Sequence, residues 1–546
     1  MLNRFKSTDK KEQNERFTVP APDQVESPSV LSEVGPLNKW LSSLPNANEN
    51  QIAKQITKAI TLLNRYPGQI KNRLELIECY RPYINRLILT QTQNQTDQEY
   101  ELLRQLITEA AYGYKHVINQ QLQHRSWLTG QKRLLTSIYF ATKLLSLELR
   151  LAYEQYDAKI ANSWHEIMRL YTLAERLKME NELVTDPTQA EVKNATISHQ
   201  LKRTLLLSLL DPGHLQPNEA RVCFDYLDQY ASLATLEQPT ENSDPTGKFI
   251  LDLSSSRPPQ QFENHKNQLD PKQHRLLNLL PVSKRVQEDI QAILLNKEDL
   301  PAALQHHLRN DAINILKRIL KSWHIRQERQ GQRENAYGWV QISIGISSIH
   351  HFLLQDEDGE EAAEFITPPD LDDSLVLGFE LHENNPIKVN YEELRCRQLN
   401  RSKNGLALHI SLSSNILPKV GQLILIRQET EEKRAGGQLA VIRRCMKQSE
   451  NTLEIGVQFI PGQVKTITLR PITTTHTDTA FQPAIVINNG LNRPSSILVA
   501  KGLYANSRQY EVAENWPASQ IVANKLIEST PGFDWFHLIT TAIKQG

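Results

Sequence analysis

A short polar run in the C-terminal third of the chain carries residue types suited to gripping a small anionic molecule. Asn400, Ser402 and Gly405 form an N-x-S-x-x-G pattern that leads directly into an apolar segment. An Asn amide can meet a base edge or a backbone group, and a Ser hydroxyl can donate to a phosphate oxygen. The glycine allows close approach of another backbone or a positive φ. The same residues also make ordinary hairpin turns, so both interpretations stay open.

Upstream, Arg329 and Arg333 form an R-x-x-x-R pair, and Arg326 shortly before them is a candidate auxiliary ligand. Two guanidinium groups can clamp phosphates bidentately and stack on purine rings, which Lys does poorly. The segment also contains Gln and Glu residues, so a solvated charged stretch is the alternative interpretation.

Three more arginines lie just before or within the Asn-Ser-Gly turn. Arg395, Arg397 and Arg401 occupy odd positions, so a regular strand would place them on one face together with residue 399. They then either assist phosphate binding, with Arg397 and Arg401 as auxiliary ligands, or face solvent on an edge strand.

The elements that must position these residues are short strands. Residues 339–345 predict a first strand, and the run after Gly405 opens another. Further β-rich segments lie at 420–426, 437–444 and 453–459, separated by polar turns. This spacing is typical of a small barrel.

Through its strand order, Gly421, Gly456 and the two motifs, this region resembles a PilZ domain, the bacterial receptor module for cyclic di-GMP. The resemblance covers roughly residues 325 to 470. It implies an antiparallel β-barrel, with an arginine segment that precedes the first strand and folds over the ligand.

The resemblance also implies a role for each residue of the two motifs. Arg329 and Arg333 would hold guanine and phosphate of the cyclic dinucleotide. Asn400, Ser402 and Gly405 would hold its other face. The ligand is then cyclic di-GMP, and no cofactor is required.

The stretch between the two motifs is longer than the PilZ pattern requires. It contains an acidic tract at 356–361 and a Pro-Pro pair at 368–369. Because long surface loops cost little stability, we expect residues 355–388 to form an insertion on the barrel surface.

Composition sets the outer limits of the interpretation. A chain of 546 residues predicts two to four domains. Lys+Arg and Asp+Glu are both 62, so there is no basic excess of the kind that nucleic-acid polymers or membrane surfaces attract. No apolar run approaches about 18 residues, so no transmembrane segment is expected. The four scattered cysteines and the absence of an apolar signal core predict a cytoplasmic location.

The sequence shows no catalytic or metal-binding constellation. No phosphate-binding loop, H-E-x-x-H or G-x-S-x-G motif occurs. His350 and His351 are adjacent, and on a strand they would point to opposite faces. We therefore expect no enzyme activity and no metal.

The expected fold class is multidomain α + β, with an N-terminal helical array, a PilZ-like antiparallel β-barrel and a small C-terminal β unit. Apolar residues at helical spacing predict the array, and Pro-rich polar stretches predict the breaks. The expected regions are a flexible tail at 1–35, the helical array at 36–233, a linker with a short docking strand at 234–282, a helical connector at 283–324, the barrel at 325–472 and the C-terminal β unit at 473–546.

These expectations combine into one function and one alternative. The first is a non-enzymatic receptor that couples cyclic di-GMP binding to a helical region that binds a protein partner. The resemblance suggests surface attachment, pili, motility or exopolysaccharide as the process controlled. The alternative is a ligand-free scaffold whose degenerate PilZ-like barrel docks other proteins.

Overall fold

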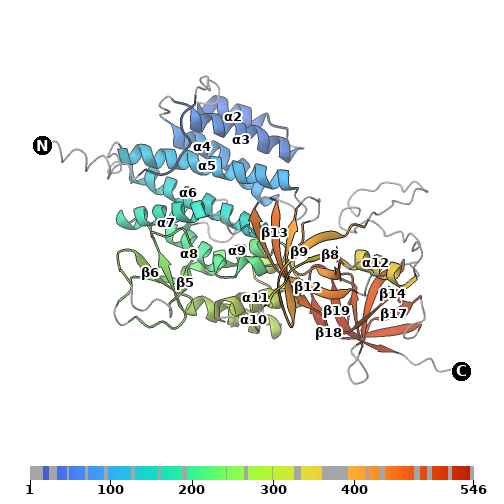
Figure 1. Cartoon of the computed structure of the whole chain (residues 1–546). Coiled ribbons are helices and arrows are strands. Elements are labelled where there is room, and N and C mark those ends of the chain that lie inside the picture. Colours follow the sequence, from blue (N-terminus) through green and yellow to red (C-terminus); the bar gives the residue numbers. More distant parts are fainter. Residues whose placement is uncertain are drawn as a thin grey trace. The chain divides into compact units, whose positions relative to one another are not determined.

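The computed structural model divides into two compact units, which are described separately. The first comprises Met1–Pro212 and Asn218–Gln327, and the second comprises Gly213–Pro217 and Glu328–Gly546. Figure 1 traces the chain by colour. The structure describes residues 16–540 except 24–32, 46–47, 68–69, 71, 91–95, 124–129, 158–160, 187–193, 241–242, 263–268, 298, 325–333, 359–390, 413–416, 430–436, 450, 473–479, 489–494 and 514–518.

The first unit is a helical array (Figure 1). Its helices before the first sheet are α2 Val34–Ser42, α3 Glu49–Arg65, α4 Arg73–Leu89, α5 Asp97–Gln123, α6 Gln131–Glu154, α7 Ala161–Arg176, α8 Ile197–Ser208 and α9 Glu219–Tyr230. Helix α6 is central, since it packs against α5, α7, α8 and α9. Nearly all its residues from Leu134 to Tyr153 are buried, and these include the charged residues Glu148 and Arg150. None of the described helices has an apolar stretch long enough to cross a bilayer.

The N-terminal segment differs from the flexible tail expected at 1–35. Phe17 is buried, its N–H donates to Asn119 Oδ1 (2.9 Å), and Asn119 Nδ2 donates back to its carbonyl (3.0 Å). The Arg169 guanidinium carbon lies 4.7 Å from the centre of the Phe17 ring. Contacts of Arg16, Phe17 and Thr18 with helices α5 and α7, and of Asp23 with Arg65, thus hold residues 16–23 on the helical array.

The region between α7 and α8 is not entirely helical. Helix α8 begins at Ile197, where the Thr196 side chain caps it by accepting from His199 N (3.0 Å). A strand pair precedes it, β1 Val184–Thr185 with β2 Asn194–Ala195.

A four-stranded sheet stands where one docking strand was predicted. The predicted docking strand is present as β4, and the sheet has the order β3-β6-β4-β5, so β4 pairs with β5 and β6. The bounds are β3 Thr235–Glu237, β4 Lys248–Asp252, β5 Gln260–Gln261 and β6 His274–Asn278. Helices α10 Leu280–Leu294 and α11 Arg309–His324 complete the unit, with 3-10 turns at Ala231–Leu233 and Ala302–Leu304.

The second unit begins with an antiparallel β-barrel, as the sequence predicted. Its strands are β7 Glu334–Asn335, β8 Trp339–Ile344, β9 Leu394–Ser402, β10 Gly405–Ser411, β11 Leu423–Gln428, β12 Gln438–Ser449 and β13 Thr452–Phe459. Six of them follow the order β8-β9-β10-β13-β12-β11, and pairing of β11 with β8 closes the barrel. The two-residue strand β7 pairs with β9 beside β8.

The C-terminal β unit is a second closed barrel. Its strands are β14 Gln463–Pro471, β15 Gln482–Asn488, β16 Ser496–Val499, β17 Gln509–Val512, β18 Gln520–Ser529 and β19 Asp534–Thr540. Their order is β14-β15-β16-β19-β18-β17, so strands one to six of each barrel are arranged 1-2-3-6-5-4. The two barrels therefore share one topology, and residues 463–471, expected in the first barrel, belong to the second.

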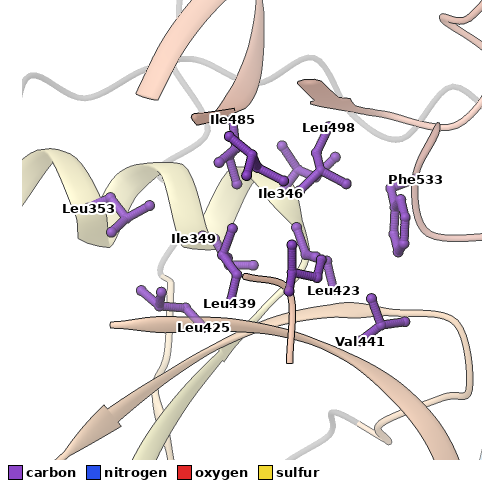
Figure 2. Close-up of a cluster of buried hydrophobic side chains, with 12 residues drawn as sticks. Ile346, Ile349, Leu353, Leu423, Leu425, Leu439, Val441, Ile485, Leu498 and Phe533 are labelled. Carbon is purple, nitrogen blue, oxygen red and sulfur yellow. The ribbon is translucent and has the colours of Figure 1, made fainter. Parts of the chain in front are cut away.

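Helix α12, Ile346–Asp358, joins the two barrels and was not predicted. Figure 2 shows Ile346, Ile349 and Leu353 of this helix among buried side chains from both barrels. The other members are Leu423, Leu425, Leu439, Val441, Ile460, Ile485, Ile487, Leu498 and Phe533. Because His350 and His351 lie on this helix, the strand argument applied to them was wrong. His350 Nε2 instead lies 3.2 Å from the carbonyl oxygen of Ile467.

Candidate functional site

The Asn-Ser-Gly pattern forms a two-residue hairpin between β9 and β10. Ser402 pairs with Gly405, which leaves Lys403 and Asn404 as the loop. Ser402 Oγ donates a long hydrogen bond to the Gly405 carbonyl (3.4 Å). The Asn404 carbonyl accepts from the backbone N–H of Phe459 (2.9 Å). The loop is therefore fixed to the neighbouring strand β13 as well as to its own hairpin.

Gly405 is needed for close approach. Of the two roles left open by the sequence, a positive φ is not found at this position. A Cβ added here would instead overlap the carbonyl oxygen of Val457 on β13. Every other residue would push β10 away from β13, so the glycine allows these two strands to pair closely.

A β-bulge at Leu399 decides which side chains share a face. Gln398 pairs with Leu408 and Asn400 with Ala407, so Leu399 has no partner of its own. Beyond the bulge, Asn400 and Ser402 lie on the outer face of the barrel. The bulge thus places the two polar residues of the motif side by side, facing outward.

The predicted arginine face was wrong for the same reason. Arg397 pairs with His409, whereas Arg401 pairs with Leu406, and these partners lie on opposite faces of β10. Arg397 is therefore on the outer face with Asn400. Arg401 lies on the other face, with its guanidinium carbon 5.5 Å from the centre of the Phe459 ring.

Cys396, which faces the inside of the barrel on β9, is unreactive. Cys396 is buried inside the barrel, and this burial raises the pKa of its thiol to about 12. A thiol of this kind is neutral at physiological pH and is no nucleophile.

The arginine motif itself, with Arg326, Arg329 and Arg333, lies outside the described residues. The two residues that follow it are described and form β7. Glu334 pairs with Arg401, and Asn335 pairs with Asn400. The chain that leaves the motif thus enters the sheet directly beside the Asn-Ser-Gly turn.

The path from β7 to β8 keeps this segment on the edge of β9. Gly338, with φ of 115°, marks the break between the two strands. Its carbonyl accepts from the backbone N–H of Gln398 (3.0 Å), and Leu399 accepts from Ala336 (3.3 Å). The break between β7 and β8 therefore lies opposite the bulge in β9, and backbone hydrogen bonds connect the two.

Two polar groups on the outer face are available to a ligand. Among the described residues, no hydrogen bond or ion pair engages the Asn400 amide or the exposed guanidinium of Arg397. Unengaged donors on a surface can bind an anion without first breaking an internal contact.

Sequence reasoning missed the polar neighbours on the next strands. Gln458 pairs with Gly405 and accepts at Oε1 from Arg443 Nε (2.9 Å). Arg443 also donates to Glu528 of the second barrel (Nη2 to Oε2, 2.8 Å). The alternation of Ile455 and Val457 could have placed Gln458 on the outer face, but nothing local indicates the contact with Glu528.

A cavity of about 730 Å³ in the helical unit is less suited to an anion. Carboxylates outnumber cations in its lining, which includes Glu101, Arg104, Glu109, Lys115, Glu148, Asp157 and Glu166. Lys115 is already engaged, because its ammonium lies 2.9 Å from Glu166 in a fully buried ion pair. Net negative charge repels a phosphate ligand, so the β9–β10 turn remains the candidate site.

Comparison with known proteins identifies two adjoining matches. Residues 35–241 match the family model "Cyclic-di-GMP receptor FimW, N-terminal domain". Residues 248–369 match "Cyclic-di-GMP receptor FimW, middle PilZ domain". Together they cover more than half of the chain. The second match begins before the range 325–470 over which the PilZ resemblance was noted. It includes the arginine motif and β8 but ends before Asn400.

A curated relative from Pseudomonas aeruginosa PAO1, named "Cyclic-di-GMP receptor FimW", is 23% identical over 367 residues. This similarity covers 64% of the present chain and 59% of the relative, so the chain spans less than two thirds of the relative's length. The N-terminal match spans the helices from α2 to α9, and the middle-domain match contains strands β7 and β8 of the first barrel. The chain therefore belongs to the FimW family, whose models describe a cyclic di-GMP receptor with an N-terminal domain and a middle PilZ domain.

Proposed function

We propose that this protein is a non-enzymatic receptor that binds cyclic di-GMP on the outer face of the first barrel. The observation that carries the proposal is the pairing of β7 with β9. Glu334 and Asn335, which directly follow the arginine motif, lie opposite Arg401 and Asn400. Two stretches far apart in the sequence therefore meet on neighbouring strands.

Each motif residue has a chemical role in this proposal. Cyclic di-GMP carries two phosphates, so the site must supply hydrogen-bond donors and positive charge. Arg329 and Arg333 supply guanidinium groups for phosphate and guanine. Ser402 supplies a hydroxyl donor and Asn400 an amide. Gly405 contributes indirectly, because the absence of a side chain allows β10 to pair closely with β13.

The consequence of binding is proposed to be a change in how the receptor presents its helical region to a protein partner. A curated relative carries the name of a cyclic di-GMP receptor. The PilZ resemblance favours surface attachment, pili or motility as the process controlled. We place the protein in the cytoplasm, where free thiols such as those of its four cysteines persist.

The second barrel supports one alternative use of the fold. It has the topology of the first barrel, but residues 463–546 contain neither R-x-x-x-R nor N-x-S-x-x-G. The same chain thus uses this fold without the ligand motifs. A scaffold function for both barrels is the rival to the receptor function.

Isothermal titration calorimetry with the full chain distinguishes the receptor function from the scaffold function. Wild type should bind cyclic di-GMP, and Arg333→Ala and Ser402→Ala should each weaken binding by about tenfold or more, since hydrogen bonds to a charged group contribute about 1.5–3 kcal/mol. Ser411→Ala, at the exposed far end of β10, is the matched control and should bind as wild type does. An absence of binding by wild type would leave the scaffold function.

A further inference from the structure

An exposed tryptophan lies on the same outer face as Asn400. Trp339 is the first residue of β8, and 45% of its surface is exposed. It pairs with Arg397 on β9, while its neighbour Val340 points into the barrel. Large aromatic rings usually bury most of their surface, so a half-exposed ring beside unengaged donors is a candidate contact for a ligand.

Arg395 lies over this ring and is held in a fixed orientation. Its guanidinium carbon is 4.4 Å from the centre of the Trp339 ring. Its Nε and Nη2 both donate to Glu429 Oε2, at 3.2 and 3.0 Å. The carboxylate and the ring together orient the guanidinium plane, yet 58% of the Arg395 side chain is exposed. A planar surface is thus already formed and accessible.

Planar cations and aromatic rings are the groups on which nucleobases stack. Arg397 lies next to this pair on the same face and presents a guanidinium that no described residue engages. A guanidinium fork matches the two acceptors of guanine, O6 and N7, whereas adenine offers a donor in place of one of them.

We infer that Trp339 and Arg395 form a stacking platform for one guanine of the cyclic dinucleotide, and that Arg397 reads the edge of that base. The inference rests on the proposed function and deepens it, because it names the residues that select guanine over adenine. Nothing in the two sequence motifs assigns this role to Trp339, Arg395 or Arg397.

The second barrel provides a matched control. Arg470 lies over Phe481 with its guanidinium carbon 4.6 Å from the ring centre, and its Nε donates to Glu511 (2.8 Å). This triad has the same chemistry as Trp339, Arg395 and Glu429 but belongs to a barrel without ligand motifs. If such triads only fasten strands, breaking either one affects stability alone.

The test is calorimetry with cyclic di-GMP and cyclic di-AMP on the full chain, together with thermal unfolding. Trp339→Ala should weaken cyclic di-GMP binding by about tenfold or more. Trp339→Phe should keep most of the wild-type affinity, and Phe481→Ala should keep all of it. Arg397→Ala should narrow the preference for cyclic di-GMP over cyclic di-AMP by about tenfold. Ligand should also change the tryptophan fluorescence of wild type more than that of Trp339→Phe.

Two outcomes would overturn the inference, and they are distinguishable. If Ser402→Ala weakens binding while Trp339→Ala and Arg397→Ala bind both ligands as wild type does, the receptor function stands and the platform is wrong. If Phe481→Ala weakens binding as much as Trp339→Ala, the triad acts only through stability. If wild type binds no cyclic dinucleotide, the proposed function and the platform both fail.

Discussion

Glu334 lies opposite Arg401 in an antiparallel pair, although 67 positions separate them in the sequence. The pair brings the end of the arginine segment to the hairpin that carries Ser402. Each motif alone is weak evidence for a binding site, because short motifs of this kind also occur by chance. A site shared by the two motifs requires that their segments lie close together in the fold. The register of β7 with β9 is therefore the structural basis of the receptor proposal.

Replacing Gly405 by alanine should destabilise the first barrel. The added Cβ overlaps the Val457 carbonyl oxygen, so β10 and β13 must separate. Overpacking of this kind costs about 1–3 kcal/mol, which urea unfolding can measure. Gly456→Ala on β13 is the control, since its Cβ would make only an ordinary contact with Arg444 (3.4 Å). Equal stability of Gly405→Ala and wild type would contradict the claim that β10 at position 405 lies too close to the Val457 carbonyl for a side chain.

Replacing Ile349 by alanine should destabilise the second unit strongly. This side chain is fully buried in the cluster that α12 forms between the two barrels (Figure 2). Large-to-small substitutions in cores cost about 2–5 kcal/mol. Unfolding monitored by chemical denaturation should show this loss, while His351→Ala on the half-buried side of α12 should cost far less. Similar losses of unfolding free energy for both variants would mean that the buried face of α12 contributes no more to stability than its other side.

The helical unit should lose stability as the pH falls from about 6.5 to 4. Burial, with repulsion from Arg73, lowers the pKa of His116 to about 4. The unfolded chain takes up this proton near pH 6.5 and the folded chain does not, so acid favours unfolding. At pH 5 the loss is about 2 kcal/mol. His116→Gln should flatten the profile of unfolding free energy between pH 7 and 5. A profile that keeps its slope in this variant would assign the proton uptake to another group.

The sequence was sufficient for the parts of the site that depend on local patterns. Val340 and Ile342 alternate with polar residues, so β8 was predicted, and the Asn-Ser-Gly turn was placed correctly before a strand. Alternation alone could not reveal the bulge at Leu399, because an extra residue is defined only by the partner strand. That single residue moved Arg401 to the other face.

Helix α12 and the closure of the two barrels were not predicted from the sequence. Ile346, Ile349 and Leu353 have helical spacing, and this signal for α12 was missed because a strand precedes it and an acidic tract follows it. The closure of each barrel joins strands that lie far apart in the chain, as in the pairing of β14 with β17. No local pattern encodes such pairing, so the second barrel was predicted only as a small β unit.

Hydrogen–deuterium exchange of the full chain with and without cyclic di-GMP tests the shared site most directly. The account predicts that ligand slows exchange in residues 325–335 and in residues 399–406 together, at the same ligand concentration, and that Ser402→Ala shifts both responses to higher concentration. Protection of only one of these segments, with the other unchanged at saturating ligand, would contradict the claim that the two motifs form one binding site.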